Sequence, residues 1–325
     1  MATYKEIHGV KVQYRDSDAP EIEGDVWYNS STGNLKMYSA AGSWASGGNL
    51  NTARAEPGSS ASGPQSATAI FGGNVSSGSP GYSALHEQYD GSSWTEAADL
   101  NVARSSGQGV GVQTAALYVL GNEPGTNHST EQWNGTSWTA VADTNTAGAG
   151  AACSGTSTAA IKAGGTVPPR TVNAETWNGT SWTEGANLNT ATTYAGGAGT
   201  STAALSIAGQ VPGSPYVSAK NESWNGTSWT EVNDLSTARY AAAGSFGVQT
   251  AALYVGGTTD PPNRGNSEEY DGVTWTEGAD LSAARQTGGG SGTTSSGLVA
   301  GGTTGSITNA TEEWTKGQNV EVITD

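Results

Sequence analysis

Apolar positions in this chain occur in short runs that turn residues separate, and the runs recur at a nearly constant interval. A representative unit begins with the small-residue stretch STARYAAAGSFG (236–247), and the apolar run TAALYVGG (250–257) follows it. A variable loop comes next, and SEEYDGVTWTEGADL (267–281) ends the unit. An almost wholly apolar run is typical of a strand that is buried on both faces. Glycine is frequent and no helical periodicity persists, so the pattern predicts an all-β protein with four short strands per unit.

The hexapeptide WNGTSW occurs three times, at residues 133–138, 177–182 and 224–229. Asn-Gly is a strong hairpin signal, because a type I′ turn needs positive φ at both central residues. Whether the loop has two residues or four, the two tryptophans lie on the same face of the hairpin as cross-strand neighbours. We therefore expect the hexapeptide to be a structural unit, and its repetition predicts an array of such units.

The second tryptophan of this motif, or its equivalent, recurs at intervals of 44 to 50 residues. The residues are Trp44, Trp94, Trp138, Trp182, Trp229 and Trp275. Strand-rich repeats of this length are typical of propeller blades. The regular repeats are residues 51–100, 101–144, 145–188, 189–235, 236–281 and 282–325, and VEVIT (320–324) offers the last strand.

Residues 1–50 fit the repeat poorly, although they contain four strand candidates that end at Trp44. Terminal repeats are expected to be atypical. Counting this segment as a divergent blade predicts a single β-propeller of seven four-stranded blades, which is the arrangement we favour. The alternative is six blades formed by residues 51–325 and a separate N-terminal anchor formed by residues 1–50.

The repeat combines an arginine near its start, a strand that ends in Gly-Gly, and tyrosine or tryptophan at fixed later positions; it resembles the kelch repeat over residues 51–325. The Gly-Gly pairs are Gly72-Gly73, Gly164-Gly165, Gly256-Gly257 and Gly301-Gly302, and the leading arginines are Arg54, Arg104, Arg239 and Arg285. Two repeats have Gly148 and Thr192 near that position instead. The resemblance implies a β-propeller and no particular chemistry. We expect the arginines to bind backbone carbonyls at blade junctions.

A second resemblance lies in the segment GDVWYNSSTGNLKMYSAAGSW (24–44), which is similar to segments of bacteriophage tail and fibre proteins. The near-identical WNGTSWTE units also resemble those of structural proteins from marine and cyanobacterial phages. The resemblance implies a protein that is made in the host cytoplasm and located in the virion. It also implies other virion proteins as partners, with several copies of the chain per particle.

Charge and cysteine content narrow the set of partners and compartments. The net charge is −16, from 13 basic and 29 acidic residues, which argues against a nucleic-acid or anionic-membrane surface. No apolar run approaches the roughly 18 residues that a membrane-spanning helix needs, so we expect no membrane insertion. The start, MATYKEIHGV, lacks the apolar region of a signal peptide. Cys153 is the only cysteine, so no disulfide forms within the chain.

Residues that could carry catalysis or bind metal are few and scattered. His8, His86 and His128 lie in different units without the spacing of metal ligands. Copper-radical oxidases built on kelch propellers need converging Cys, Tyr and His, but Cys153 lies in a small-residue stretch that predicts a buried, inert thiol. YDGSSW and YDGVTW are similar to the Asp-box turn of sialidases, with a spacing one residue shorter. We therefore expect no catalytic site, no metal site, no cofactor and no enzymatic activity.

The loops after the Gly-Gly strands vary most, and in a propeller they all emerge on one face. They are residues 74–83, 122–129, 166–172, 210–218, 258–267 and 303–309, and their candidate binding residues are Tyr82, His128, Arg170, Tyr216 and Arg264. Proline in these loops lowers the entropy cost of binding. The sequence thus favours a non-enzymatic virion structural or adhesion protein that binds a host-surface glycan or neighbouring subunits. The alternative is a soluble carbohydrate-binding propeller or a divergent glycan-active enzyme.

Overall fold

The computed structural model describes residues 12–17, 26–39, 42–76, 81–123, 127–166, 169–317 and 319–323. The chain divides into two compact units, one formed by residues 44–315 and the other by residues 1–43 together with 316–325. The described residues form seven four-stranded sheets and one short 3-10 turn, η1 (Gln65–Ala67). The all-β class and the four-stranded sheets predicted from the sequence are thereby confirmed. No helix among the described residues is long and apolar enough to cross a membrane.

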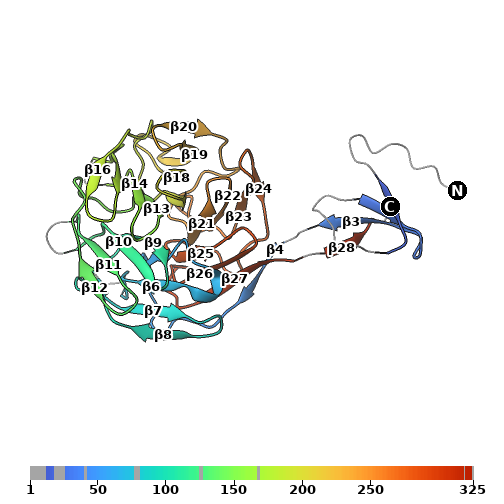
Figure 1. Ribbon diagram of the computed structural model, residues 1–325, viewed down its shortest axis with the longest axis horizontal. Coiled ribbons are helices and arrows are strands. Elements are labelled where there is room, and N and C mark those ends of the chain that lie inside the picture. The colour runs from blue at the N-terminus through green and yellow to red at the C-terminus, as the bar shows by residue number, and fades with distance from the viewer. Residues whose placement is uncertain are drawn as a thin grey trace. The chain divides into compact units, whose positions relative to one another are not determined.

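Six of the sheets surround an axis, as Figure 1 shows; five are each formed by one regular repeat, and the sixth combines the last repeat with β4. From the axis outward, the first sheet consists of β5 (Gly58–Ser59), β6 (Ala69–Phe71), β7 (His86–Tyr89) and β8 (Trp94–Ala97). The second consists of β9 (Gln108–Val112), β10 (Ala115–Val119), β11 (Thr130–Trp133) and β12 (Trp138–Ala140). The third consists of β13 (Ala152–Gly155), β14 (Ala160–Ala163), β15 (Ala174–Trp177) and β16 (Trp182–Glu184). The fourth consists of β17 (Gly196–Gly199), β18 (Ala204–Gln210), β19 (Val217–Trp224) and β20 (Trp229–Val232). The fifth consists of β21 (Gly244–Val248), β22 (Ala251–Val255), β23 (Ser267–Tyr270) and β24 (Trp275–Glu277). The sixth consists of β25 (Gly289–Gly292), β26 (Ser296–Ala300), β27 (Thr311–Lys316) and β4 (Gly42–Ser46).

The six sheets close into a ring. The innermost strands follow one another in a cycle, from β5 through β9, β13, β17 and β21 to β25 and back to β5. The last sheet takes its outermost strand, β4, from the N-terminal side of the chain, so the first and last parts of this unit share a sheet. Joining the two ends of the unit within one sheet avoids an open seam with unpaired strand edges. Six blades are therefore sufficient for closure, as the six-blade alternative requires.

The seventh sheet belongs to the other compact unit and has the order β1 (Gln13–Arg15), β2 (Val26–Asn29), β3 (Asn34–Ser39), β28 (Asn319–Val322). Strands β1 and β2 pair in parallel, whereas β2 with β3 and β3 with β28 pair antiparallel. This differs from the expectation that VEVIT completes the last repeat and that Trp44 belongs to the N-terminal segment. Because β4 already occupies the place beside β27, the C-terminal strand pairs with β3 instead.

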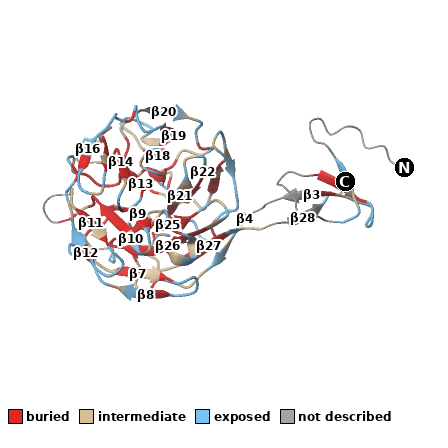
Figure 2. Ribbon diagram, viewed as in Figure 1, coloured by how far each residue is buried: buried red, intermediate tan, exposed pale blue. Residues whose placement is uncertain are grey.

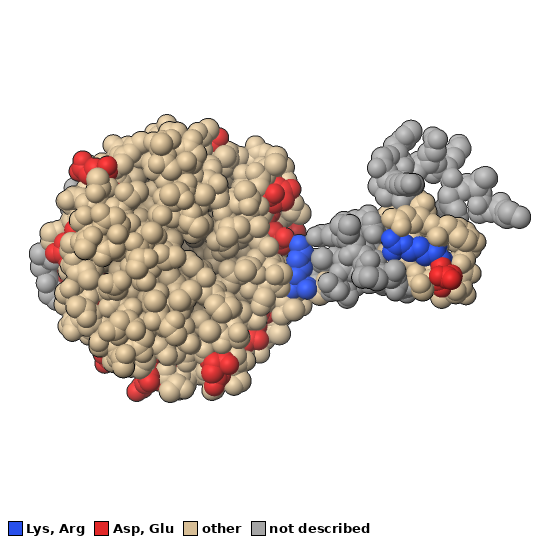
Figure 3. All heavy atoms as spheres, viewed as in Figure 1, with Lys and Arg blue, Asp and Glu red and all other residues tan. Residues whose placement is uncertain are grey.

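Apolar side chains pack between neighbouring blades in six clusters, one for each junction. Phe71 of the first regular repeat contacts the cluster formed by Tyr118 and Trp138 of the next. Ile70 and Leu298 belong to the cluster that joins the first and last repeats. Figure 2 shows buried residues on the inner and middle strands of the ring and exposed residues on its outer strands. In the view of Figure 3, the acidic side chains of the ring lie toward its periphery.

The tryptophan hairpins confirm the predicted cross-strand pairing. Trp133 lies directly opposite Trp138, and their ring centroids are 5.5 Å apart. The turn itself is not type I′, because it has four residues and only Gly135 has positive φ, at 96°. Asn134 Oδ1 instead accepts hydrogen bonds from the backbone N–H groups of Thr136 at 2.9 Å and Ser137 at 3.0 Å. The asparagine therefore shapes the turn through its side chain rather than through its backbone.

The leading arginines are buried and structural, as the sequence indicates. Arg104 donates to the carbonyl oxygens of Leu120 at 3.0 Å and Tyr118 at 3.2 Å, and pairs with Glu131. All these partners lie in its own repeat rather than across a blade junction. Asn101 donates its backbone N–H and its side-chain amide to the same carboxylate. The glutamate partner, which was not predicted from the sequence, recurs in all six repeats, whereas two repeats have Ser in place of Asn101 and two others lack the arginine.

Candidate functional site

One residue from each repeat forms a closed circle of backbone hydrogen bonds around the axis of the ring. The six residues, which we call the mouth circle, are Glu56, Ser106, Gly150, Tyr194, Ala241 and Thr287. Each backbone N–H donates to the carbonyl oxygen of the equivalent residue in the preceding repeat, and Glu56 closes the circle by donating to Thr287, with N–O distances of 2.6 to 2.9 Å. All six residues have left-handed φ values, between 53° and 64°. This conformation points one N–H and one C=O of every repeat along the circle.

The mouth circle and the variable loops lie on the same face of the ring. The residue before each circle residue pairs with a residue at the start of the loop that follows the second strand. Ala55, for example, pairs with Asn74, and Tyr240 pairs with Thr258. The sequence prediction that these loops share one face is consistent with this pairing, and the circle marks where that face meets the axis.

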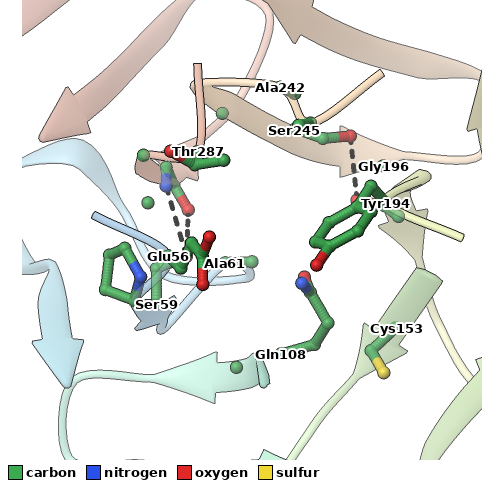
Figure 4. Close-up of a pocket in the computed structure, with 18 of the residues that line it drawn as sticks. Glu56, Ser59, Ala61, Gln108, Cys153, Tyr194, Gly196, Ala242, Ser245 and Thr287 are labelled. Carbon is green, nitrogen blue, oxygen red and sulfur yellow. Dashed lines mark hydrogen bonds between the residues drawn. The ribbon is translucent and has the colours of Figure 1, made fainter. Parts of the chain in front are cut away.

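Inside the circle lies a cavity of about 70 Å³ between the inner strands. Its polar lining, part of which Figure 4 shows, consists of Glu56, Ser59, Ser106, Gln108, Tyr194, Ser245 and Thr287. Glycine in the inner strands permits this arrangement, because a Cβ atom added to Gly109 would lie 2.1 Å from the carbonyl oxygen of Ser59. The small residues predicted beside the axis are therefore required by the close approach of neighbouring strands.

Glu56 is the carboxylate of this cavity among the described lining residues. Its Oε2 accepts hydrogen bonds from Ser105 Oγ at 3.1 Å and from Ser106 Oγ at 2.5 Å. Burial, together with the negative charge of Glu56, raises the pKa of Tyr194. Tyr194 and Tyr240 lie near one another, with ring centroids 6.4 Å apart and planes inclined by 50°. The site thus combines one negative charge with hydroxyl, amide and aromatic groups.

Cys153 also lines the cavity, at a deeper position on β13. Burial raises the pKa of its thiol to about 12, although the positive charge of Lys162 acts in the opposite direction. The thiol is therefore protonated near neutral pH and is a poor nucleophile. This confirms the prediction of a buried cysteine. Among the described residues, no group of three or more His, Cys, Asp or Glu side chains could hold a metal ion.

The five candidate residues from the sequence lie in the loops around the mouth, one in each of five repeats: Tyr82, His128, Arg170, Tyr216 and Arg264. All are partly exposed, and none is among the described residues that line the cavity. Arg170 Nη2 donates to Gln210 Oε1 at 3.0 Å, which joins two neighbouring loops. His128 Nε2 lies 3.7 Å from Asp143 Oδ2. Among the described residues, no hydrogen bond, ion pair or ring contact links any two of these five residues.

The mouth circle was not predicted from the sequence, although the repeats contain a signal for it. Each of its residues stands two positions after the leading arginine or the residue that replaces it, as in Arg54-Ala55-Glu56 and Thr192-Thr193-Tyr194. The position changes from Glu to Ser, Gly, Tyr, Ala and Thr, and the position before it also varies, whereas the residue after it is Pro57 or a small Gly or Ala. Comparing the repeats position by position therefore identifies a variable pair of residues within the segment.

No family model and no curated protein matches the sequence. Among solved structures, 313 chains match, so the fold is widely shared. One of them, titled "Structure of YjhT", aligns with a TM-score of 0.65 over 84% of this chain and 99% of its own length. Sequence identity over the alignment is 12%, so the likeness concerns the fold alone. The chain therefore shares the β-propeller fold with that structure.

Proposed function

We propose that the protein is a non-enzymatic structural and adhesion protein of a virion. In this proposal the ring binds a ligand on a cell surface through the face that carries the mouth circle. The unit formed by β1, β2, β3 and β28 attaches the chain to the particle, in contact with other virion proteins and in several copies. The similarity of residues 24–44 to segments of phage tail and fibre proteins supports the virion assignment.

The observation that carries the binding role is the variation of side chains on a repeated scaffold. A buried glutamate equivalent to Glu131 recurs in all six repeats and accepts a backbone N–H from the start of its repeat, for example from Asn51 and Ser236. The mouth circle, in contrast, presents a different side chain in every repeat. A scaffold that fixes its backbone and varies its side chains around one opening is suited to the recognition of a ligand.

The chemistry of the opening favours binding over catalysis. Most glycoside hydrolases need two carboxyl groups that flank the scissile bond, and Glu56 alone supplies a carboxyl group among the described residues of the cavity. The protonated thiol of Cys153 is a weak nucleophile. The second candidate, a carbohydrate-binding propeller or divergent glycan-active enzyme outside a particle, is favoured by Tyr194, which lines the cavity together with Glu56 and lies next to Tyr240.

The test uses purified particles and the purified full-length chain. Mass spectrometry of the particles should detect the chain, and an antibody against the ring should slow adsorption of the particles to cells. Variants Tyr194→Ala and Tyr240→Ala should adsorb more slowly while the amount of protein per particle stays constant. Thr136→Ala, in an exposed hairpin turn, is the control and should adsorb at the parent rate. Particles without the chain would overturn the virion role, and glycoside hydrolysis by the purified chain would favour the second candidate.

A further inference from the structure

The mouth circle holds a negative charge that no described cation neutralises. Five of the six equivalent buried glutamates have a cationic partner, as Glu87 has Arg54, and the sixth, Glu222, accepts two backbone N–H groups and the side-chain amide of Asn189. Among the ion pairs of the described residues, none includes Glu56, whose recorded hydrogen-bond partners are the serine hydroxyls of Ser105 and Ser106. Both hydroxyls donate to Oε2, and no described donor reaches Oε1. The carboxylate therefore retains an acceptor oxygen without a described donor at the opening of the cavity.

One aromatic ring lines the same cavity as this carboxylate, and a second ring lies next to the first. Tyr194 lines the same cavity, and Tyr240 lies in the adjacent repeat at 6.4 Å from it between centroids. The circle residue between Tyr194 and Ser106 is Gly150, where an added Cβ would lie 3.0 Å from Tyr194 Cδ1. The absence of a side chain at Gly150 leaves room for the tyrosine ring on the side of the circle that carries Ser106 and Glu56. A carboxylate beside aromatic faces is suited to an organic cation, which gains both an ion pair and cation–π attraction.

The remaining lining groups are neutral and can exchange hydrogen bonds with hydroxyls. Gln108 offers an amide, whereas the hydroxyls of Ser245 and Thr287 donate to backbone carbonyls and offer their oxygens as acceptors. Figure 4 shows Gln108, on β9, and Tyr194, in the segment before β17, projecting into the cavity. A ligand with several hydroxyl groups satisfies such a lining better than an apolar amine does. The cavity of about 70 Å³ accommodates the amine-bearing edge of a terminal sugar rather than a long chain.

We infer that the mouth of the ring binds an amino sugar, with its protonated amine on Glu56, its ring against Tyr194 and its hydroxyls toward Gln108 and Thr287. This inference rests on the proposed function, because it names the ligand class of the same surface. It requires the free amine, since an acetylated amine carries no positive charge. It also distinguishes the central mouth from the surrounding loops, whose cationic residues Arg170 and Arg264 suit ligands of the opposite charge.

The test is titration calorimetry of the full chain with glucosamine, glucose, N-acetylglucosamine and n-butylammonium at about pH 6, where amines are protonated. Glucosamine should bind at least tenfold more tightly than glucose or N-acetylglucosamine. Glu56→Gln should abolish this difference, because it removes the charge and keeps an oxygen that accepts from the serines. Glu184→Gln, which removes one exposed charge on β16, is the matched control and should preserve the difference. The melting temperatures of both variants establish that they fold.

Three results would overturn the inference. Equal binding of glucosamine and glucose would show that the amine is not recognised. A preference that survives Glu56→Gln would place the amine elsewhere. Binding of n-butylammonium as tight as that of glucosamine would indicate a lysine side chain of a protein ligand instead of a sugar. Particles that still adsorb through this chain, without any preference for glucosamine, would refute the amino-sugar inference while leaving the adhesion role intact.

Discussion

Lys162 Nζ lies 2.9 Å from Glu175 Oε1 in the interior of the third regular repeat, and both side chains are almost fully buried. In four other repeats an arginine at the start of the unit pairs with the equivalent glutamate, whereas this repeat has Gly148 there. Lys162 comes instead from β14. Burial alone would raise the pKa of Glu175, but Lys162 and the N–H groups of Asn145 and Thr146 outweigh it and lower the pKa. The repeat therefore keeps the ion pair although the cation comes from a different strand.

Replacing Lys162 with methionine should destabilise the ring strongly. The substitution leaves Glu175 as a buried charge without a cation, and removal of one partner from a buried pair costs about 3–5 kcal/mol. Urea unfolding followed by tryptophan fluorescence measures this change. Adding Gly148→Arg to Lys162→Met should recover part of the loss, because it restores the cation at the position used by other repeats.

The control for this experiment is Lys220→Met. Lys220 Nζ lies 3.0 Å from Glu231 Oε2, a similar distance, but both side chains are about half exposed. Exposed ion pairs contribute little to stability, so this variant should unfold at nearly the parent urea concentration. Equal effects of the two substitutions would show that burial does not determine the importance of the pair at Lys162.

Stability should decrease as pH falls from about 6.5 to about 4, because of His86. Burial among aromatic rings lowers the pKa of His86 to about 4 from its ordinary value of 6.5. Between these values the unfolded chain binds a proton that the folded chain does not, so acid favours unfolding. From pH 7 to pH 5 this linkage costs about 2 kcal/mol. Urea titrations of the parent and of His86→Phe should differ in their pH dependence by this amount, and parallel profiles would contradict the assignment.

The repeat sequence predicts the blades well because the determinants are local. The pairing of Trp133 with Trp138 follows from their spacing around a turn, and the buried second strand follows from its apolar run. Ring closure is not local. Both β4 and β28 are short strands that fit the edge of a sheet, and the sequence does not state which of them pairs with β27. That choice depends on contacts between residues far apart in the chain, so the strand predicted for the last blade, VEVIT, differs from the strand that pairs with β27.

The sequence also predicts only part of the candidate site, because the rest depends on contacts between repeats. Variable loops are visible as differences between repeats, and they lie on the expected face. Glu56 and Tyr194 stand within an otherwise regular motif, and their importance arises from the left-handed backbone that brings six repeats to one opening. Glycine and asparagine are the usual sequence signals of left-handed φ, and Glu56, Tyr194 and Thr287 carry neither signal. Only the closed ring explains it, because the circle of hydrogen bonds needs all six repeats.

Trp229→Ala should lower the stability of the ring substantially. Trp229 is 7% exposed and packs against Trp224 with ring centroids 5.3 Å apart. Truncation of a well-packed aromatic typically costs about 3–5 kcal/mol. Thermal unfolding followed by circular dichroism should show a clearly lower midpoint, whereas Thr227→Ala, in the exposed turn of the same hairpin, should cost little. A melting temperature within a degree of the parent would show that this ring does not support the blade junction.

Deletion of residues 319–325 should spare the ring, because the last blade is completed by β4 and not by β28. The deletion removes the strand that pairs with β3, so it should disrupt the sheet of the other unit.

Trp44→Ala tests the complementary part of this assignment, that β4 completes the last blade. Trp44 packs against Trp314 with centroids 5.3 Å apart, and its Nε1 donates to Ser267 Oγ at 2.9 Å. Hydrogen exchange should therefore show increased exchange in β3 after the deletion and in β27 after Trp44→Ala. Loss of protection throughout the ring after the deletion would instead place the C-terminal strand in the closing blade.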